Sequence, residues 1–289
     1  MGEQLSPRES IDLIKNHEFA VQKKFGQNFL IDENILDQIV CEAGVGPEDT
    51  VLEIGPGMGA LTGRLLKAAK KVIAVEVDKM LIPILEGTLG NDPKFVLINE
   101  DILKVDIKKL IEEENEGKPI KVVANLPYYI TTPIVMSLLE GEPGIESITV
   151  MVQKEVAQRM MEGPGSKAYG ALSLAVGYYS RPNLVLNVSK NCFYPKPDVD
   201  SAVIRLDVYG PSEKPVEAAD TEKLFAVIRA AFGQRRKTLV NSLGNAANVG
   251  ASKAQVAEAL KELGYEETIR GEALSLEEFI KLTDVLART

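Results

Sequence analysis

The chain has 289 residues, with 33 Lys and Arg against 42 Asp and Glu, so its net charge is −9. Taken alone, this charge argues against a nucleic-acid partner, because phosphate binding is driven by Lys and Arg. One histidine, His17, and two widely separated cysteines, Cys41 and Cys192, exclude histidine-based triads, cysteine zinc sites and a disulfide framework. We therefore expect no metal centre.

The sequence shows no segment typical of secretion or membrane insertion. The first twenty residues lack the apolar core of a signal peptide, and no apolar run approaches the roughly 18 residues of a membrane span. The length is typical of about two domains. We expect a cytoplasmic, monomeric, two-domain protein that does not bind membranes.

The N-terminal part is expected to hold two helices separated by a basic stretch. Ser6 begins the first helix with a capping pattern, and residues 23–30 form the basic stretch. Asp32 is expected to cap the second helix, which runs to about Cys41, with Gly44 beyond its end.

From Thr50 onward, short apolar segments alternate with segments of helical spacing. Residues 112–114 form an acidic run, interpreted as a solvated face, and further strands are expected at about 171–179 and 201–208. Repeated alternation of this kind predicts an α/β fold, with a mainly parallel sheet covered by helices on both faces. The expected strands are 50–54, 72–75, 95–98, 121–124 and 148–152, and the expected helices are 61–69, 80–89 and 133–139.

The C-terminal part follows a different pattern. Residues 210–219 are rich in turn formers and are interpreted as a linker. Ser275 and Glu278 form a capping box that opens the last expected helix. We therefore expect a domain over residues 1–210 and a small all-helical domain over 211–289. The expected helices of the second domain are 221–232, 235–243, 252–263 and 275–286.

A glycine-rich loop over residues 53–59 joins the first strand of the sheet to a helix. Its glycines allow close approach of the backbone to a ligand, and Glu76, at the end of the next strand, can accept hydrogen bonds from ribose hydroxyls. With Ala60, the loop also matches the fingerprint of dinucleotide-binding proteins. A tight turn that binds no ligand is a further alternative interpretation. Glu53 before the glycines and Asp101 after the third strand favour S-adenosylmethionine.

The segment Asn125–Tyr128 directly follows the fourth strand of the sheet, where ligands bind in such folds. Asn125 supplies an amide oxygen, and Tyr128 supplies a flat aromatic face. The residue before Pro127 avoids the helical region, so its carbonyl is not drawn into the first turn of a helix. An exocyclic amine such as N6 of adenine needs acceptors for its N–H groups and accurate positioning rather than a strong base. A turn with a buried tyrosine is the alternative interpretation.

A second aromatic segment spans residues 193–201, where two prolines favour an extended loop before a strand. Phe193 or Tyr194 could stack on a base, because enzymes that modify a base take it out of its stack and hold it between flat side chains. A proline-rich turn with a core aromatic is the alternative.

Five motifs occur in an order that resembles the ribosomal RNA adenine dimethyltransferases, specifically their small-subunit branch. The motifs are residues 24–30, 53–57, 125–130, 193–197 and 232–237, and the resemblance covers residues 10–286. It implies a Rossmann-like class I methyltransferase sheet and a small helical domain that helps dock on the ribosomal particle. It also implies S-adenosyl-L-methionine as cofactor and two methylations of N6 on each of two adjacent adenosines near the 3′ end of small-subunit rRNA in an assembling 30S-type particle.

The resemblance also implies roles for particular residues. The cofactor-binding residues are Gln27, Asn28, Leu30, Gly55, Gly57, Glu76, Asp101, Ile102 and Asn125. Among these, Glu76 holds the ribose hydroxyls and Asp101 the adenine amine. Asn125 and the Leu126 carbonyl, followed by Pro127, receive the target amine. Tyr128 and Phe193 sandwich the target base.

Three alternatives remain at this stage. The large-subunit branch that confers antibiotic resistance uses the same chemistry, although residues 128–133 and the segment around Phe193 favour the small-subunit branch. A non-catalytic factor in ribosome assembly or transcription would need neither an intact cofactor loop nor Asn125. An NAD-dependent oxidoreductase would require a second phosphate site and a hydride-acceptor pocket, which the sequence does not indicate.

The charge is unevenly distributed along the chain, which weakens the argument from the net value. Residues 221–240 hold five basic residues against one acidic residue, a balance of 5 − 1 = +4. We expect a basic, RNA-binding surface whose contribution is local and salt-sensitive. The expected RNA-binding residues are Lys23, Lys24, Arg229, Arg235, Arg236 and Lys237.

Overall fold

A computed structural model of the chain describes residues 28–140, 144–210 and 212–288. The expected helix at Ser6 and three expected site residues, Lys23, Lys24 and Gln27, lie outside the described residues. The chain divides into two compact units. One contains the described residues up to Ala157 together with Arg181–Val208, and the other contains Gln158–Ser180 and the described residues from Tyr209 onward.

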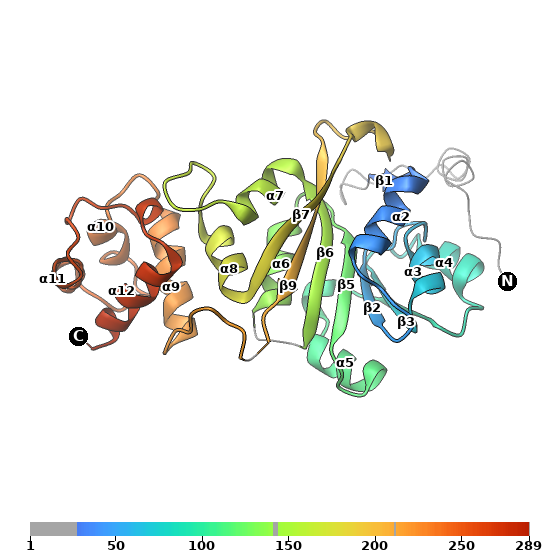
Figure 1. The fold of residues 1–289 in the computed structure, drawn as a ribbon, viewed down its shortest axis with the longest axis horizontal. Helices are drawn as coiled ribbons and strands as arrows, with labels where there is room; N and C mark the ends of the chain where they lie inside the picture. Colours follow the sequence, from blue (N-terminus) through green and yellow to red (C-terminus); the bar gives the residue numbers. More distant parts are fainter. Residues whose placement is uncertain (1–27, 141–143, 211, 289) are drawn as a thin grey trace. The chain divides into compact units, whose positions relative to one another are not determined.

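The first unit is built on a seven-stranded sheet with the order β4-β3-β2-β5-β6-β9-β7 (Figure 1). Neighbouring strands from β4 to β6 run parallel, and β9 pairs antiparallel with β6. Parallel strands buried on both faces read as continuous apolar runs, which explains why their positions are visible in the sequence. The strands are β2 Thr50–Ile54, β3 Lys71–Glu76, β4 Phe95–Asn99, β5 Ile120–Asn125, β6 Ile145–Gln153, β7 Ser180–Val188 and β9 Ser201–Val208.

Helices cover both faces of this sheet. Because crossovers between parallel strands are right-handed, the connections from β2 toward β4 place α3 and α4 on one face, and the return through β5 places α5 and α6 on the other. The strand order reverses between β2 and β5. The helices are α2 Glu33–Glu42, α3 Thr62–Ala68, α4 Ile82–Leu89, α5 Ile107–Asn115, α6 Thr131–Leu139 and α7 Lys154–Met161.

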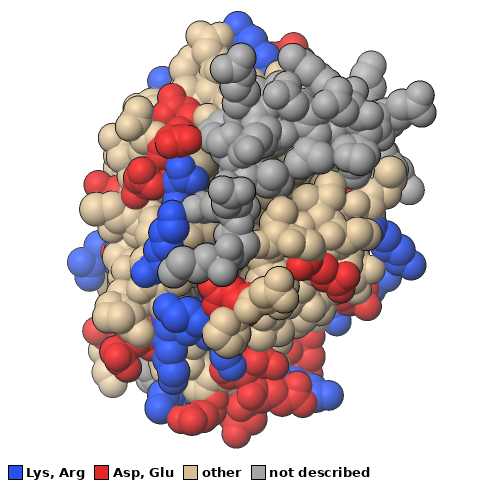
Figure 2. All heavy atoms as spheres, turned by 90° about the vertical axis from the view of Figure 1, so that its right-hand side faces the viewer, with Lys and Arg blue, Asp and Glu red and all other residues tan. Residues whose placement is uncertain are grey.

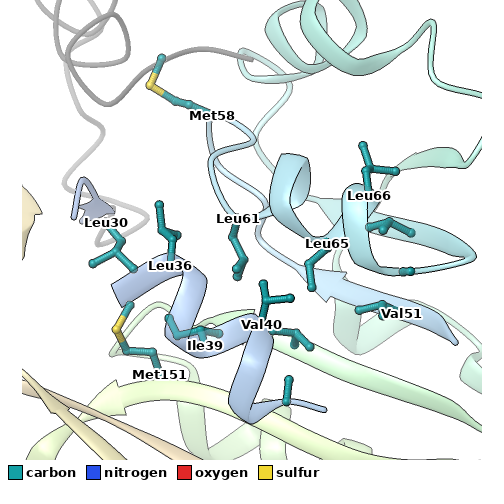
Figure 3. Packing of buried hydrophobic residues seen from close by; sticks show 14 of the residues in the cluster. Leu30, Leu36, Ile39, Val40, Val51, Met58, Leu61, Leu65, Leu66 and Met151 are labelled. Atoms are coloured by element: carbon teal, nitrogen blue, oxygen red, sulfur yellow. The ribbon is translucent and has the colours of Figure 1, made fainter. Parts of the chain in front are cut away.

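One large apolar cluster fixes α2 and α3 against the sheet (Figure 3). Leu36, Ile39 and Val40 of α2 are buried with Leu65 of α3 and Val51 of β2. The expected cap of α2 is confirmed, because the Asp32 carboxylate accepts the N–H groups of Asn34 and Ile35 at 3.1 and 3.3 Å. The buried side chains of α2 therefore hold this helix against the sheet.

The second unit is helical apart from its connecting segments. The Ser275–Glu278 capping box is confirmed, since each residue bonds the backbone N–H of the other at 3.3 and 2.7 Å. Tyr179 stacks on Phe225 with ring centroids 5.5 Å apart. The helices are α8 Ala171–Tyr179, α9 Thr221–Gly233, α10 Leu239–Leu243, α11 Lys253–Glu262 and α12 Leu276–Arg288.

One expectation about this architecture is wrong. The strand expected at 171–179 is helix α8, because its apolar residues are buried nearly all round and leave no helical periodicity to read. The run 112–114 lies on helix α5, where Glu112 and Glu113 are exposed, so its interpretation as a solvated face is confirmed. Helix α7 and strand β7 were not expected. Residues 158–180, placed in the first domain by the expected boundary at 210, lie in the second compact unit.

Candidate active site

A cavity of about 270 Å³ lies at the carboxyl ends of β2, β3, β4 and β5. Ligands bind in open α/β sheets at this end, where the strand order reverses. Residues from the four loops that follow these strands meet there with residues of the segment before α2. The expected site residues that line the cavity are Asn28, Leu30, Gly55, Gly57, Glu76, Asp101, Ile102, Asn125, Leu126, Pro127 and Tyr128.

The glycine loop after β2 forms part of the cavity wall. Gly55, Gly57 and Gly59 have φ angles of +67°, +60° and +83°, a backbone region that residues other than glycine rarely adopt. A Cβ atom at Gly55 would meet nothing within 4 Å, whereas one at Gly57 would lie 3.1 Å from the Phe29 ring. Gly55 therefore leaves open space for a ligand, while Gly57 allows tight packing.

Glu76, at the end of β3, ties this loop to the neighbouring strand. One carboxylate oxygen accepts the N–H of Gly57 at 3.3 Å, and the other accepts the N–H of Asp78 at 2.8 Å. Burial raises the pKa of Glu76, and these backbone hydrogen bonds oppose the rise. The side chain is only 4% exposed, so its position is well defined before any ligand binds.

Glu53, in β2 just before the glycines, is almost completely buried, with 1% of its surface exposed. Burial raises the pKa of its carboxyl to about 8, and the charge of Glu76 adds to this rise while Thr62 opposes it. No described residue bonds its Oε2 atom. Such an unpaired buried oxygen is costly, so it marks a position where an additional donor would be stabilising.

Asp101 follows β4, and its two carboxylate oxygens have different surroundings. Its Oδ1 atom caps the short turn Ile102–Lys104 by accepting the Leu103 N–H at 3.1 Å. The cap orients the carboxylate along the cavity wall. The second oxygen has no protein partner among the described residues, so it can accept a hydrogen bond from a ligand.

Asn125 and Leu126 supply two oxygen acceptors at the end of β5. The Asn125 amide nitrogen donates to the Asn28 carbonyl at 3.1 Å, which fixes the amide plane. The Leu126 N–H donates to the Met151 carbonyl at 3.1 Å. Within the described part of the chain, nothing donates to the Asn125 side-chain oxygen or to the Leu126 carbonyl. Both acceptors are therefore available for the N–H groups of an amine.

Tyr128 is held by a partner that the sequence did not indicate. Its hydroxyl lies 2.7 Å from the hydroxyl of Ser201, at the start of β9. Ser201 is fully buried, and it is the last residue of the aromatic segment 193–201, in which no role was expected for it. Burial raises the pKa of Tyr128, with Ser201 opposing and Asp200 adding to the rise. This bond fixes the plane of the Tyr128 ring at the cavity wall.

Phe193 lies beside Leu30 but outside the cavity wall. It belongs to β8, Phe193–Tyr194, which pairs antiparallel with β1, Phe29–Leu30, and its register partner is Leu30. Its ring is 3% exposed, packs in the core cluster with Leu36, and does not line the cavity. The expected sandwich of the base by Phe193 therefore stays a prediction. The buried ring supports the segment that contains Asn28 and Leu30.

Comparison with known proteins agrees with this geometry. A family profile described as ribosomal RNA adenine dimethylase matches residues 18–285. The chain belongs to this family. The resemblance drawn from the five motifs is thereby confirmed, and so is the expectation of an rRNA-modifying methyltransferase with a Rossmann-like sheet.

Relatives and solved structures match the chain over most of its length. The "Ribosomal RNA small subunit methyltransferase A" of Lachnoclostridium phytofermentans is 56% identical, over 97% of this chain and 96% of the relative. A dimethyladenosine transferase from Plasmodium falciparum has 26% identity and a TM-score of 0.70, covering 87% of this chain and 94% of that one. The 23S rRNA methyltransferase ErmE has 28% identity and a TM-score of 0.65, covering 90% and 100%.

The expected RNA-binding residues differ in whether their charged groups are exposed or bonded within the protein. Arg229, Arg236 and Lys237 are exposed. The Arg235 guanidinium instead bonds the Glu272 carboxylate at 3.3 Å and the Ser166 carbonyl at 3.2 Å. Arg235 therefore supports the fold of the second unit, while Arg236 and Lys237 leave their charges at the surface.

Charge on the first unit is mixed where described residues are visible in Figure 2, with acidic side chains gathered toward the lower end of that face.

The described residues contain no group of three or more His, Cys, Asp or Glu side chains arranged to hold a metal ion. Every helix within the described ranges is too short or too polar to cross a bilayer.

Proposed function

We propose that this protein transfers methyl groups from S-adenosyl-L-methionine to N6 of two adjacent adenosines near the 3′ end of small-subunit rRNA, giving N6,N6-dimethyladenosine during assembly of the subunit. The observation that carries the proposal is the pair of unpartnered acceptors, Asn125 Oδ1 and the Leu126 carbonyl, beside the Tyr128 ring. The small-subunit assignment is supported by the name of the relative with 56% identity.

The cavity residues fit S-adenosyl-L-methionine, which supplies an electrophilic methyl group on a sulfonium. The open space at Gly55 suits close approach of a ligand to the backbone. Glu76 would hold the ribose hydroxyls, and the free oxygen of Asp101 would accept the adenine amine. The buried Glu76 carboxylate also lies in the cavity wall, where a negative charge favours binding of a cationic ligand.

The chain's own contribution to the reaction is positioning and hydrogen bonding. Two acceptors at Asn125 and Leu126 would take the two N–H groups of the target amine and orient its lone pair. Accurate placement and fixed dipoles of this kind lower a barrier without a strong base. Tyr128, held by Ser201, would stack on the target base after it leaves its helix.

The first transfer replaces one N–H with N–CH3 and releases a proton, so the amine keeps one N–H and the two acceptors no longer have two donors. The methylated amine must then rotate or shift to bring its lone pair back into line. The Asn125 amide is held from one side only, by Asn28, and it can still accept the remaining N–H. A second methylation in the same cavity is consistent with this arrangement.

The exposed charges of Arg236 and Lys237 are proposed to bind rRNA phosphates. Removal of one phosphate-binding charge weakens the dependence of log K on log salt by about one, so Arg236→Ala and Lys237→Ala should each reduce this slope by about one. Arg235→Ala should instead lower the stability of the second unit, because its guanidinium is already bonded. The measurement is particle binding over a salt series, with thermal unfolding alongside.

The decisive experiment is methyl transfer from labelled cofactor to immature small subunits, followed by mapping of the modified nucleotides. We expect dimethylation of two adjacent adenosines near the 3′ end of the small-subunit rRNA. Naked large-subunit rRNA is the parallel substrate, because ErmE is also structurally similar. Methylation of that substrate instead would overturn the small-subunit assignment. Normal cofactor binding with no methyl transfer to either would indicate a non-catalytic factor.

A further inference from the structure

Tyr129 is unusual among the aromatic residues of this protein. Its side chain is 58% exposed, yet it lines the cavity that holds Asn125 and Leu126. In the described part of the chain it is the only aromatic side chain that is mainly exposed, and no described residue bonds its hydroxyl. Large aromatic rings are normally buried for most of their surface, so an exposed ring at a cavity mouth is available for a ligand.

The backbone that presents this ring is fixed. Within the turn between β5 and α6, the Ile130 N–H and the Thr131 hydroxyl both donate to the Pro127 carbonyl, at 3.2 and 3.1 Å. Helix α6 begins directly after the turn, at Thr131. A ring held from a rigid turn loses little freedom when it stacks on a ligand, which favours binding.

The position of Tyr129 in the turn defines what it can meet. It is four residues from Asn125 and adjacent to Tyr128, which is itself anchored to Ser201 at 2.7 Å. A target base with its amine at Asn125 stays covalently joined to its neighbouring nucleotide, which must lie at the cavity mouth. An exposed ring at this mouth therefore meets the neighbouring nucleotide rather than the target.

We infer that Tyr129 stacks on the base next to the target adenosine and thereby helps to select which adenosine enters the cavity. The inference rests on the proposed function. Aromatic side chains stack on bases through their faces, and the interaction is worth about five- to hundredfold in binding when the aromatic is replaced by alanine. A platform on one side of the cavity meets only the neighbour on that side, which is the other adenosine for one target and a different nucleotide for the other target. The stacking partner therefore differs between the two adenosines.

The test compares Tyr129→Ala and Tyr129→Phe with the wild type on immature small subunits. Tyr129→Ala should raise KM for the particle about fivefold or more, with cofactor affinity by calorimetry unchanged. Tyr129→Phe keeps the ring and should behave as the wild type. Leu184→Ala is the matched control, because Leu184 is 44% exposed and lies outside the cavity wall.

A second arm separates stacking from a merely structural effect. Particles are prepared in which one or the other of the two adjacent adenosines is replaced by uridine, so that a single target with an altered neighbour remains. The KM ratio of Tyr129→Ala to wild type should shrink in one of the two altered particles and persist in the other. Equal ratios in all three particles, or equal losses in the alanine and phenylalanine variants, would overturn the inference.

The wild-type reaction on unaltered particles keeps this inference distinct from the proposed function. Adenine methylation by the wild type together with a fully active Tyr129→Ala variant rejects the stacking role alone. Absence of adenine methylation by the wild type rejects the proposed function, and the stacking role with it.

Discussion

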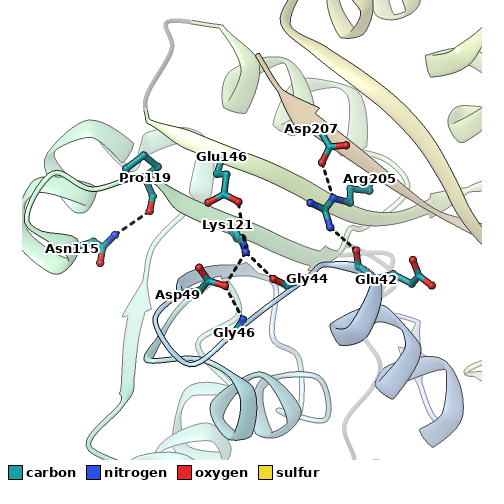
Figure 4. Close-up of polar contacts among 10 residues, drawn as sticks. All are labelled: Glu42, Gly44, Gly46, Asp49, Asn115, Pro119, Lys121, Glu146, Arg205 and Asp207. Carbon is teal, nitrogen blue, oxygen red and sulfur yellow. Dashed lines mark hydrogen bonds and ion pairs between the residues drawn. The ribbon is translucent and has the colours of Figure 1, made fainter. Parts of the chain in front are cut away.

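The two ends of the same parallel strands have opposite polar chemistry. At the amino ends, the Lys121 ammonium donates to the Gly44 carbonyl at 2.7 Å and to Asp49 at 2.8 Å, and it lies 3.6 Å from Glu146 (Figure 4). At the carboxyl ends, the acceptors of Asn125 and Leu126 have no protein partner among the described residues.

The same contrast extends to neighbouring groups. Arg205 bonds Asp207 at 2.7 Å and the Glu42 carbonyl at 2.8 Å, so another basic group outside the cavity has protein partners (Figure 4). Near the cavity, the Glu53 Oε2 atom is buried and unpaired within the described ranges. Buried polar groups are normally paired, but the Ser147 and Thr149 hydroxyls of β6 are also unpaired and do not line the cavity. An unpaired oxygen therefore indicates a ligand only where it also lines the cavity, as Glu53 does. Paired groups at the opposite end hold the sheet together.

The strongest test of this contrast is Asn125→Ala. Loss of a fixed polar group at a reacting atom costs about 10²–10³ in kcat, so methyl transfer should fall by this factor while cofactor affinity and unfolding temperature change little. Asn183→Ala is the matched control, because Asn183 is exposed and bonds Asp207 outside the cavity. A fully active Asn125→Ala variant would show that the amine is not held there.

Lys121→Met should have the complementary effect at the amino ends. Removing the ammonium leaves the Asp49 carboxylate, which is only 25% exposed, with the Gly46 N–H as its remaining partner, and this costs about 3 kcal/mol of folding free energy. Urea unfolding measures the loss, and kcat of the folded fraction should stay at the wild-type value. Lys118→Met is the control, since Lys118 and Glu116 are both exposed, and no measurable change is expected there. Equal stability of the Lys121→Met and Lys118→Met variants would show that the contacts of Lys121 do not stabilise the fold.

The position of the cavity was predictable from the sequence, because it follows from the order of strands and helices along the chain. Apolar strand patterns located Ile54, Glu76 and Asn125 at strand ends, and parallel strands bring their carboxyl ends to one edge. The cavity was therefore predictable from residues spread over a hundred positions. The cap at Asp32 was predictable because capping depends only on residues up to three positions away.

Other features depend on tertiary contacts that carry no local signal. Ser201 reaches Tyr128 across 73 positions, and nothing in the sequence pairs the two. The burial of Phe193 follows from its pairing with β1, a two-residue strand too short to recognise. Helix α8 was missed because a helix buried on all sides has the same apolar composition as a central strand.

Glu53 gives a test based on pH. The folded protein keeps a proton on Glu53 up to about pH 8, whereas the unfolded chain loses it near 4.5. Between these values the folded state binds more protons, so stability falls as pH rises, by up to about 1.4 kcal/mol per pH unit. Glu53→Gln should remove most of this slope, as measured by urea unfolding at pH 5.5 and 7.5. Glu86→Gln, at an exposed glutamate of α4, is the control. An unchanged slope in Glu53→Gln would mean that Glu53 is ionised in the folded protein.

The smallest expected effect concerns the hydroxyl that links Tyr128 to Ser201. Tyr128→Phe keeps the ring and loses only this hydrogen bond, worth about 1 kcal/mol, so kcat should fall only about fivefold. Ser201→Ala should cause a similar loss, and the double variant should lose no more than either single one, because both changes remove the same hydrogen bond. Tyr128→Ala should lose far more, since it also removes the stacking face. Additive losses in the double variant would show that the hydroxyls act separately, and the orientation of the ring would then depend on the turn at Pro127 alone.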